Sequence, residues 1–425
     1  MMKVNWSGFS KKTYPERLKT LRDSDLLSHE LQENLEKNET LSVAIADQLS
    51  ENVVGTFSLP FSIVPEVIVN NQAYTVPYVT EEPSVVAAAS FACKIINRSG
   101  GFSALVQQRL MIGQVALYQV PDREQACQEI LNQKDQLLEI ANQAYPSIVK
   151  RGGGARELRV EKVSGQTDFL VVYLHVDTQE AMGANMLNTM LEALKPHLES
   201  LSCGQSLMGI LSNYATESLV TSSCRIAFHY LSPNKDEARE LADKIVLASH
   251  FAQADPYRAA THNKGIFNGI DALLIATGND WRAIEAGAHA YASRDGLYRG
   301  LSLWTLDSEK EELIGEMTLP MPIATKGGSI GLNPRVVLSH ELLGQPSAKD
   351  LAQIIVSMGL AQNFAALKAL VGAGIQQGHM KLQAKSLALL AGAKEAEVPK
   401  LVEGLIAEKT FNLEKAESIL KALRS

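Results

Sequence analysis

The sequence contains few cysteines, and they form no recognisable pattern. Four cysteines occur in 425 residues, none of them in a Cys-x-x-Cys pair, so neither a disulfide framework nor a zinc ribbon is expected. The nine histidines form no His-Glu-x-x-His pattern, and we predict no metal site. A net charge of −7 and a pI near 5.8 disfavour nucleic acid as the main partner.

Long apolar runs are also scarce. We find none near the roughly 18 residues that cross a bilayer, and the first residues, MMKVNWSGFSKKTYPERL, lack the apolar stretch of a signal peptide. We therefore predict a cytoplasmic protein without a membrane partner. The usual nucleotide fingerprint is missing as well. The sequence VGAGIQQG at 371–378 is one residue too long for Gly-x-Gly-x-x-Gly, and it follows a predicted helix rather than a strand.

The stretch from Asp255 to Asp280 carries the strongest signal that is present. It begins with Asp-Pro, which is typical of a helix start. Helical spacing aligns one polar stripe along it: Arg258, Thr261, Lys264, Asn268 and Asp271. A solvated face is the ordinary explanation of such a stripe. However, Gly265 and Gly269 each cost the helix roughly 1 kcal/mol, which favours a close approach to the backbone. The residues alone leave both explanations open.

His262, Asp280 and the acids at 81–82 can each be explained by a structural role as well as by a functional one. His262 lies on a different face of the helix and could be a core histidine, and Asp280 would lie in a capped turn before the next helix. The sequence Glu81-Glu82-Pro83-Ser84 precedes a helix of small residues, with Pro83 at its first position. Acids at that place interact favourably with the helix dipole, so they require no function.

The order of predicted elements is that of an α+β protein. Residues 109–214 read β-α-β-β-α-β, the ferredoxin-like plan, with one long helix over 124–145. Strand signals before and after this unit indicate that it is inserted into a large mixed α/β domain, formed by 1–108 and 215–374. Residues 375–425 are predicted to form a small helical C-terminal domain.

Several motifs, in their order along the chain, together resemble the class II (soluble, bacterial-type) 3-hydroxy-3-methylglutaryl-CoA reductases. They are ENVVGTFSLP, EEPSVVAAAS, GGGARELRV, EAMGANMLNTM, the block from Asp255 to Tyr291, LPMPIATKGG, MGLAQNFAALKAL and GIQQGHM. The resemblance implies reduction of 3-hydroxy-3-methylglutaryl-CoA to mevalonate and CoA by two hydride transfers. It also implies a large substrate domain, an inserted cofactor domain and a C-terminal flap.

The resemblance also assigns roles to residues. Lys264 would stabilise the oxyanion, Asp280 would keep Lys264 in place, and Glu82 would supply a proton. His379, on the flap, would protonate the CoA thiolate. Substrate contacts fall on Ser84, Arg258 and Asn268. Cofactor contacts fall on Glu180, Met182, Gly183, Asn185 and Asn213. From the residues alone, Gly183 and Asn185 already open a helix whose N-terminus could hold a phosphate.

The cofactor and the partner are further expectations. Relatives that prefer NAD place an aspartate before the Gly-Gly-Gly turn, whereas this chain has Lys150 and Arg151 there. We therefore predict NADPH, with NADH possible. The family also implies a homodimer with its active site between subunits, reached by Glu51 and Asn52 of the partner. The alternatives are an NAD-dependent enzyme working in the degradative direction, a non-catalytic CoA- or nucleotide-binding module, and an acyltransferase.

Overall fold

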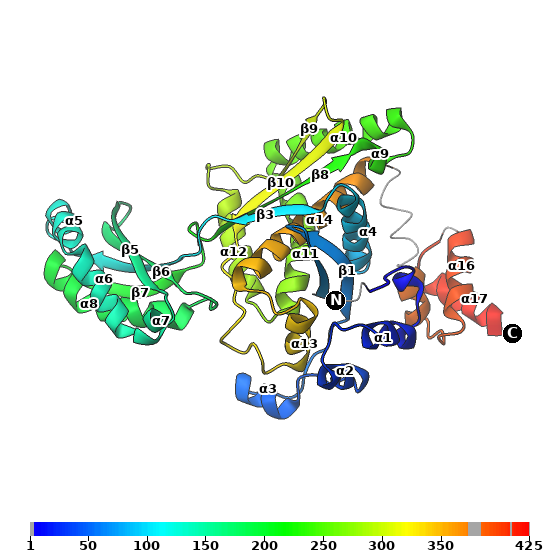
Figure 1. The fold of residues 1–425 in the computed structure, drawn as a ribbon, viewed down its shortest axis with the longest axis horizontal. Helices are drawn as coiled ribbons and strands as arrows, with labels where there is room; N and C mark the ends of the chain where they lie inside the picture. Colours follow the sequence, from blue (N-terminus) through cyan, green and yellow to red (C-terminus); the bar gives the residue numbers. More distant parts are fainter. Residues whose placement is uncertain (1–3, 373–383, 409, 425) are drawn as a thin grey trace.

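The computed structural model describes residues 4–372, 384–408 and 410–424. A six-stranded mixed sheet forms the centre of the large domain, in the order β2-β1-β3-β8-β10-β9 (Figure 1). Its strands are β1 Phe61–Val69, β2 Gln72–Val79, β3 Phe102–Val106, β8 Leu219–Ala227, β9 Ser302–Asp307 and β10 Glu312–Pro320. All neighbours pair antiparallel except β1 and β3.

Helices cover this sheet and bury a single large core. They are α4 Val85–Arg98, α9 Phe228–Leu231, α10 Lys235–Ala254, α11 Pro256–Ala276, α12 Trp281–Ala292, α13 Pro334–Leu342 and α14 Ala348–Val371. Helix α14 packs against strands β3, β8 and β10 and against helices α4, α10 and α11, and most of its residues are buried. Contacts on nearly every side explain why its composition is so apolar.

Helix α14 corrects one expectation from the sequence. It is long and apolar enough to cross a membrane, although no run of that kind was expected. Within the described residues, 72% of its most apolar window is buried by the protein itself. Its apolar composition is therefore that of a core helix, with its sides facing β8, β10, α4 and α11.

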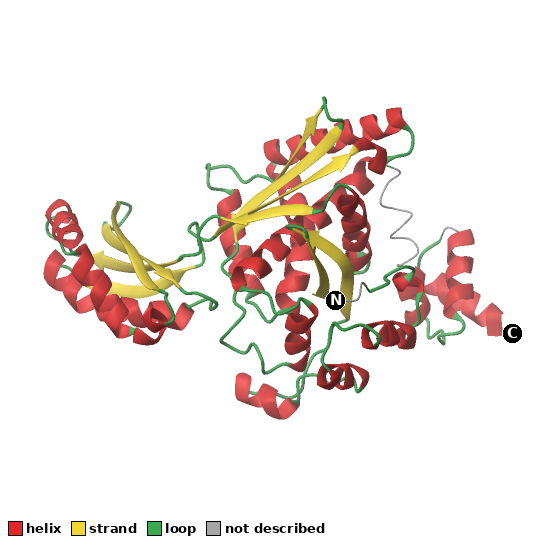
Figure 2. Cartoon of the chain, in the orientation of Figure 1, coloured by secondary structure: helices red, strands yellow, loops and turns green. Residues whose placement is uncertain are grey.

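The second sheet has four strands in the order β5-β6-β4-β7, and all neighbours are antiparallel. The strands are β4 Met111–Tyr118, β5 Gly154–Val163, β6 Phe169–Asp177 and β7 Gln205–Ser212, and helix α8, Ala184–Ser202, joins the last two. This is the predicted ferredoxin-like topology, and the α+β fold class is confirmed. Figure 2 shows the helices gathered on one side of this sheet.

The long helix expected over 124–145 is broken. The structure has α5 Arg123–Asn132, α6 Lys134–Ala144 and α7 Pro146–Lys150. The backbone leaves helical geometry at Gln133 (φ −99°, ψ 14°). The buried side chains on either side of the break, Ile130 and Leu137, keep a helical spacing of seven residues. Periodicity therefore gave no sign of the interruption.

The chain crosses between the two sheets twice. It leaves β3 at Val106 and returns at Leu219 in β8. The two connecting segments pair with each other, since the Gln107 amide donates to the Leu219 carbonyl (3.2 Å) and the Leu110 amide donates to the Glu217 carbonyl (2.9 Å). The domain boundaries predicted at 108/109 and 214/215 remain predictions.

The two ends of the chain form small helical units. At the N-terminal end, the 3₁₀ turn Phe9–Lys11 precedes α1 Tyr14–Arg22, α2 His29–Glu36 and α3 Val43–Leu49. Leu21, Leu27 and Leu31 of this region cluster with Leu338 and Leu342 of α13. At the C-terminal end, helical residues 384–390, α16 Val398–Glu408 and α17 Leu413–Arg424 share a separate core.

Candidate active site

Helix α11 begins as its sequence predicts. Asp255 is the N-cap, its Oδ2 accepts the Arg258 amide at 2.7 Å, and Pro256 occupies the first turn. The guanidinium of Arg258 is half-buried, and burial lowers its pKa. Among the described residues it has no hydrogen-bond or ion-pair partner. A half-buried cation with free donors is suited to hold a carboxylate.

The polar stripe of α11 meets Glu82, which lies 182 residues earlier than Lys264. The Lys264 ammonium pairs with Glu82 Oε2, and the Asn268 amide lies 3.4 Å from Glu82 Oε1. The ion pair is open to solvent, with Lys264 59% and Glu82 38% exposed. Three of the predicted site residues therefore converge, and a ligand can reach the face on which they lie.

The structure corrects the expected helix start beside Glu82. Helix α4 begins at Val85, so Pro83 does not occupy its first position. Ser84 is the N-cap residue and has left-handed backbone (φ 76°), which a β-carbon disfavours. The first turn of α4 contains no acid. Glu82 therefore lies before the helix and not in its first turn, and its carboxylate lies against Lys264 and Asn268.

Asp280 caps helix α12, as predicted, by accepting the Ala283 amide at 3.1 Å. The expected contact with Lys264 is not formed. Among the described residues, the ion pair of Asp280 is with Arg282 (3.7 Å) and that of Lys264 is with Glu82. Since Asp280 is committed to its own helix start, its link to Lys264 stays a prediction.

His262, on the opposite face of α11, is a core residue. Its Nε2 lies 2.7 Å from Ser302 Oγ and 3.1 Å from the Asn363 amide nitrogen. Burial, with the nearby Arg258 charge, lowers its pKa to about 3. Asn363 Oδ1 also accepts the Trp304 indole N–H at 2.7 Å. The network is buried and most of its polar atoms are paired, which is typical of structural polar groups; His262 Nδ1 has no hydrogen-bond partner among the described residues.

Asp271 ends the polar stripe and faces α12. Burial raises its pKa to about 8, and Glu285 of α12 adds to the effect through its charge and a hydrogen bond. Within the described residues, its buried Oδ1 has no hydrogen-bond partner. Asp271 is three residues from Asn268 and therefore on the same side of the helix. Nothing in the sequence pointed to this acid pair.

The predicted cofactor residues lie around the N-terminus of α8. Gly183 is its N-cap with φ 94°, and a β-carbon there would come within 2.3 Å of Thr178 Cγ2. Among the described residues no side chain caps this helix, so its first N–H groups, including those near Asn185, can donate hydrogen bonds to an anion. Met182 packs against the small-domain core.

Glu180 bonds to the large domain, and its predicted contact with the cofactor stays a prediction. Its Oε2 accepts the Thr325 hydroxyl at 2.6 Å and the Ala348 amide at 2.7 Å. These partners belong to the large domain, so the carboxylate is occupied by protein. The backbone at Asn213 lies against α12, where a β-carbon on Gly287 would meet the Asn213 carbonyl at 2.3 Å.

Lys150 and Arg151 end helix α7 and are exposed. The turn that follows packs against the loop before α8, since a β-carbon on Gly153 would lie 2.5 Å from the Asp177 carbonyl. The basic turn and the α8 loop are therefore neighbours, although 26 or more residues separate them.

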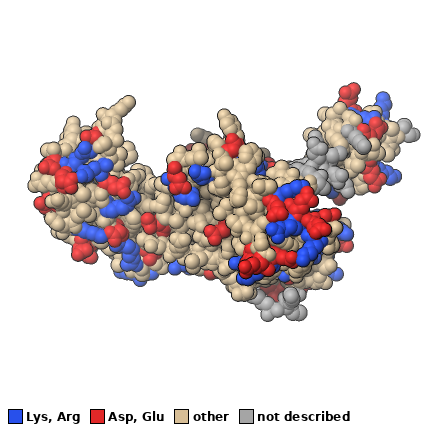
Figure 3. Space-filling model, turned by 90° about the horizontal axis from the view of Figure 1, so that it is seen from above, with Lys and Arg blue, Asp and Glu red and all other residues tan. Residues whose placement is uncertain are grey.

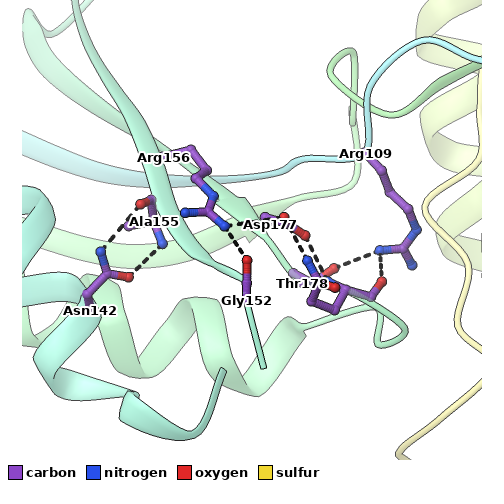
Figure 4. Close-up of polar contacts among 8 residues, drawn as sticks. Arg109, Asn142, Gly152, Ala155, Arg156, Asp177 and Thr178 are labelled. Carbon is purple, nitrogen blue, oxygen red and sulfur yellow. Dashed lines mark hydrogen bonds and ion pairs between the residues drawn. The ribbon is translucent and has the colours of Figure 1, made fainter. Parts of the chain in front are cut away.

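The structure adds a charge pair that the sequence did not reveal. Arg156 donates to the Gly152 carbonyl and lies 3.6 Å from the Asp177 carboxylate (Figure 4). Asp177 is thus an acid beside the basic turn, but its charge is partly offset by Arg156. A strand-end acid 26 residues after the turn could not be assigned to this place from the sequence.

His379 lies outside the described residues, so the structure gives no place for it. The other predicted site residues form two groups. Glu82, Ser84, Arg258, Lys264, Asn268 and Asp280 belong to the large domain, on α11 and at the starts of α4 and α12. The second group, on the small domain, consists of Lys150, Arg151, Glu180, Met182, Gly183, Asn185 and Asn213.

Comparison with known proteins identifies the family. The family model described as hydroxymethylglutaryl-coenzyme A reductase matches residues 13–384. A 3-hydroxy-3-methylglutaryl-coenzyme A reductase of Archaeoglobus fulgidus is 41% identical over 421 residues, covering 98% of this chain and 94% of that protein. The chain belongs to the hydroxymethylglutaryl-coenzyme A reductase family. The resemblance inferred from the motifs is therefore confirmed.

Solved structures in this reductase family agree with the fold. The 3-hydroxy-3-methylglutaryl-coenzyme A reductase of Streptococcus pneumoniae is 76% identical, with a TM-score of 0.87 over 99% of this chain and 100% of that one. A class II reductase structure from the same organism, described as bound to NADPH in open conformations, is 77% identical. Its TM-score is 0.86, over 87% of this chain and 100% of that one.

Proposed function

We propose that this chain reduces 3-hydroxy-3-methylglutaryl-CoA to mevalonate and CoA in two hydride transfers, as its family membership implies. The observation that carries the proposal is the convergence of Lys264, Asn268 and Glu82 on an exposed face. A cation, an amide and an acid at one place can bind a carbonyl oxygen and exchange a proton with it.

Each side chain has a task that fits its chemistry. NADPH, when bound, supplies the hydrides. Lys264 stabilises the negative charge that develops on the thioester oxygen and then on the aldehyde oxygen. Glu82, in contact with Lys264, provides the proton that the alkoxide takes up. Asp280 is proposed to orient Lys264 once substrate displaces Glu82 from its present pairing.

The substrate is held by the neighbouring groups. Arg258 binds the terminal carboxylate with its free guanidinium donors, because guanidinium and carboxylate match in a bidentate pair. Ser84 and Asn268 bind the hydroxyl and carbonyl oxygens. His379 protonates the departing CoA thiolate. An H379A variant should lose thioester reduction but keep mevaldehyde reduction, and equal loss of both would contradict this role.

NADPH is proposed as the cofactor in preference to NADH. The uncapped N-terminus of α8 suits the pyrophosphate, and the exposed Lys150 and Arg151 turn beside it suits a 2′-phosphate. Support also comes from the 77% identical reductase, whose structure is described as bound to NADPH. The adjacent Asp177 does not oppose this assignment, because it is paired with Arg156.

The test is oxidation of NADPH and NADH, followed by absorbance, with 3-hydroxy-3-methylglutaryl-CoA present. We expect NADPH to be oxidised faster. The double variant K150Q/R151Q should lower kcat/KM for NADPH by about tenfold or more, since two phosphate-pairing charges are lost, and should leave NADH oxidation nearly unchanged. Faster oxidation of NADH by the unaltered protein would reject the cofactor assignment. No oxidation of either would reject the reductase proposal.

A homodimer is proposed as the working assembly, with Glu51 and Asn52 completing the partner's site. This segment precedes β1 without regular structure, and Val54 and Phe57 in it are 103% and 90% exposed, a poor solvent-facing arrangement for apolar side chains. Sedimentation equilibrium should give twice the chain mass of 46.2 kDa. A monomer with full activity would reject the shared site. A cytoplasmic location is part of the proposal and is testable by cell fractionation.

A further inference from the structure

Arg109 lies in the first segment that connects the two sheets, and its side chain is partly buried. Its Nη1 donates to the Thr178 hydroxyl (3.2 Å) and the Gln179 carbonyl, and its Nη2 donates to the Ala181 carbonyl (3.2 Å). A further bond goes to the Ile323 carbonyl. One guanidinium thus bonds to the loop before α8, as Figure 4 shows for Thr178, and to a segment of the large domain.

Glu180 also joins loop 177–183 to the large domain, but it accepts hydrogen bonds where Arg109 donates them. Its side chain accepts the Thr325 hydroxyl and the Ala348 amide, and its carbonyl accepts the Thr325 amide at 3.0 Å. Glu180 of loop 177–183 therefore bonds to the large domain. Arg109 donates to the carbonyls of the residues before and after Glu180.

The large-domain partner of both residues also holds the turn that carries Asp280. Asn279 makes two hydrogen bonds to the backbone of Ala324, accepting its amide at 2.7 Å and donating to its carbonyl at 3.1 Å. Residues 321–325, the anchor segment, are thus hydrogen-bonded on one side to the turn that carries Asp280 and on the other side to Arg109 and loop 177–183.

The burial of Arg109 costs solvation free energy, because its guanidinium is charged. Loss of solvation lowers the pKa of its guanidinium, although the nearby Glu180 and Asp177 charges act in the opposite direction. Its Nε is buried without a partner among the described residues. The two domains have separate hydrophobic cores, so packing within either core does not require this cation. Its bonds instead fix how the two domains meet.

We propose that Arg109 and Glu180 are positioning residues. They set the distance between the hydride-donating carbon of the cofactor and the carbonyl carbon of the substrate beside Lys264. The inference rests on the proposed function. Hydride transfer requires the donor and acceptor carbons to be within about 3–3.5 Å, and a misplacement of about 1 Å can cost roughly 100-fold in rate. Loop 177–183 carries the N-terminus of α8, and the anchor segment carries the turn of Asp280. Their junction therefore controls this distance.

The test compares R109Q, R109K and T325V with the unaltered protein, using NADPH and NADPH deuterated at the transferred position. We expect R109Q to lower kcat by about 10- to 100-fold, with KM for 3-hydroxy-3-methylglutaryl-CoA changed less than about threefold. The deuterium isotope effect on kcat should rise, because the transfer itself becomes limiting. R109K should recover part of the loss, since an ammonium can still bond to two of the carbonyls.

R123Q is the matched control. Arg123 pairs with Asp168 at 2.9 Å, on α5 at the far end of the small domain (Figure 1), and its removal should leave all kinetic values unchanged. A purely structural arginine would lower the folded fraction without changing kcat per folded molecule or the isotope effect, and that result for R109Q overturns the proposal.

T325V provides a second route if R109Q does not fold. It removes only the hydroxyl that Glu180 accepts, and we expect a smaller loss of kcat, about three- to tenfold, again with a raised isotope effect. Unchanged kinetics in T325V and R109Q would overturn the positioning role. An unaltered protein that oxidises neither cofactor would instead refute the proposed function, so the two failures can be told apart.

Discussion

Helix α11 carries polar side chains on two faces. The faces differ in whether these side chains are buried among protein partners or open to solvent. His262 and Asn263 face inward, where Ser302, Asn363 and the 299–301 backbone pair with His262 Nε2 and with the Asn263 amide. His262 Nδ1 has no partner among the described residues. Lys264 faces outward, where Glu82 is its partner in an ion pair open to solvent. Buried polar groups that pair within the protein maintain the fold, whereas exposed groups that pair only with each other can exchange that partner for a ligand.

The largest effect should come from the exposed face. K264A should lower kcat by about 100- to 1000-fold, the usual cost of losing one oxyanion donor. The melting temperature should hardly change, since Lys264 is 59% exposed. K244A, which removes an exposed ion pair with Glu240 on α10, is the control and should keep full activity. Steady-state kinetics and thermal unfolding on both variants check this, and normal turnover by K264A would contradict the functional reading of the stripe.

The buried face should show the opposite pattern. H262Q should lower the unfolding free energy by about 1–3 kcal/mol, because the hydrogen bonds to Ser302 and Asn363 are disturbed in a dry site. Turnover per folded molecule should change little. Chemical denaturation at pH 8 measures the loss, and a variant as stable as the parent would show that this network is not structural.

The same variant has a pH signature. His262 has a pKa of about 3 in the folded protein against 6.5 unfolded, so the unfolded chain binds the extra proton as pH falls below 6.5. The unaltered protein should therefore lose stability from pH 6.5 downward, by up to about 1.4 kcal/mol per pH unit from this group. H262Q should lose less over that window, and equal slopes would contradict the assignment.

Asp271 should show a pH dependence of the opposite sign. Its folded pKa of about 8 exceeds the ordinary 3.8, so the folded protein keeps a proton that the unfolded chain releases. Its contribution to stability is present below pH 4 and is lost as pH rises through 8. D271N does not titrate, so its melting temperature relative to the parent should increase between pH 5 and pH 9. A constant difference would refute the raised pKa.

Local patterns predicted the elements well where they depend on neighbours in the chain. The Asp255-Pro256 helix start, the Asp280 cap and the ferredoxin-like order all follow from short-range signals. Asn70 and Asn71, which join β1 to β2, both have positive φ, a conformation that Asn adopts more readily than most residues. The helix break at Gln133 could not be predicted, because the apolar spacing continues through it.

Contacts between distant segments were beyond the reach of the sequence. The alternative explanation for Glu82 assumed that α4 began at Pro83, and only the left-handed Ser84 shows that it does not. Glu180 was assigned to the cofactor by its motif, although its hydrogen bonds are with Thr325 and Ala348. Arg109 belongs to no motif at all, since its significance depends on three segments that meet only in the folded chain.

The general distribution of surface charge could be predicted from the sequence, but the charge arrangement at one turn could not. Acidic and basic side chains are intermixed over both domains in the view of Figure 3, as composition alone would suggest. The basic turn consists of Lys150 and Arg151, and the charge of the nearby Asp177 is partly offset by Arg156. This arrangement depends on contacts across 26 residues and becomes visible only in three dimensions.

The paired crossings between the sheets have a consequence for how this architecture can be altered. Because Gln107 bonds to Leu219 and Leu110 to Glu217, the ends of the four-stranded unit enter and leave the large domain side by side. A module with adjacent ends can be exchanged as one piece, as domain insertion in general shows. A hybrid that accepts another dinucleotide could therefore be made by grafting one continuous segment, provided that Arg109 and Glu180 keep their partners at the junction.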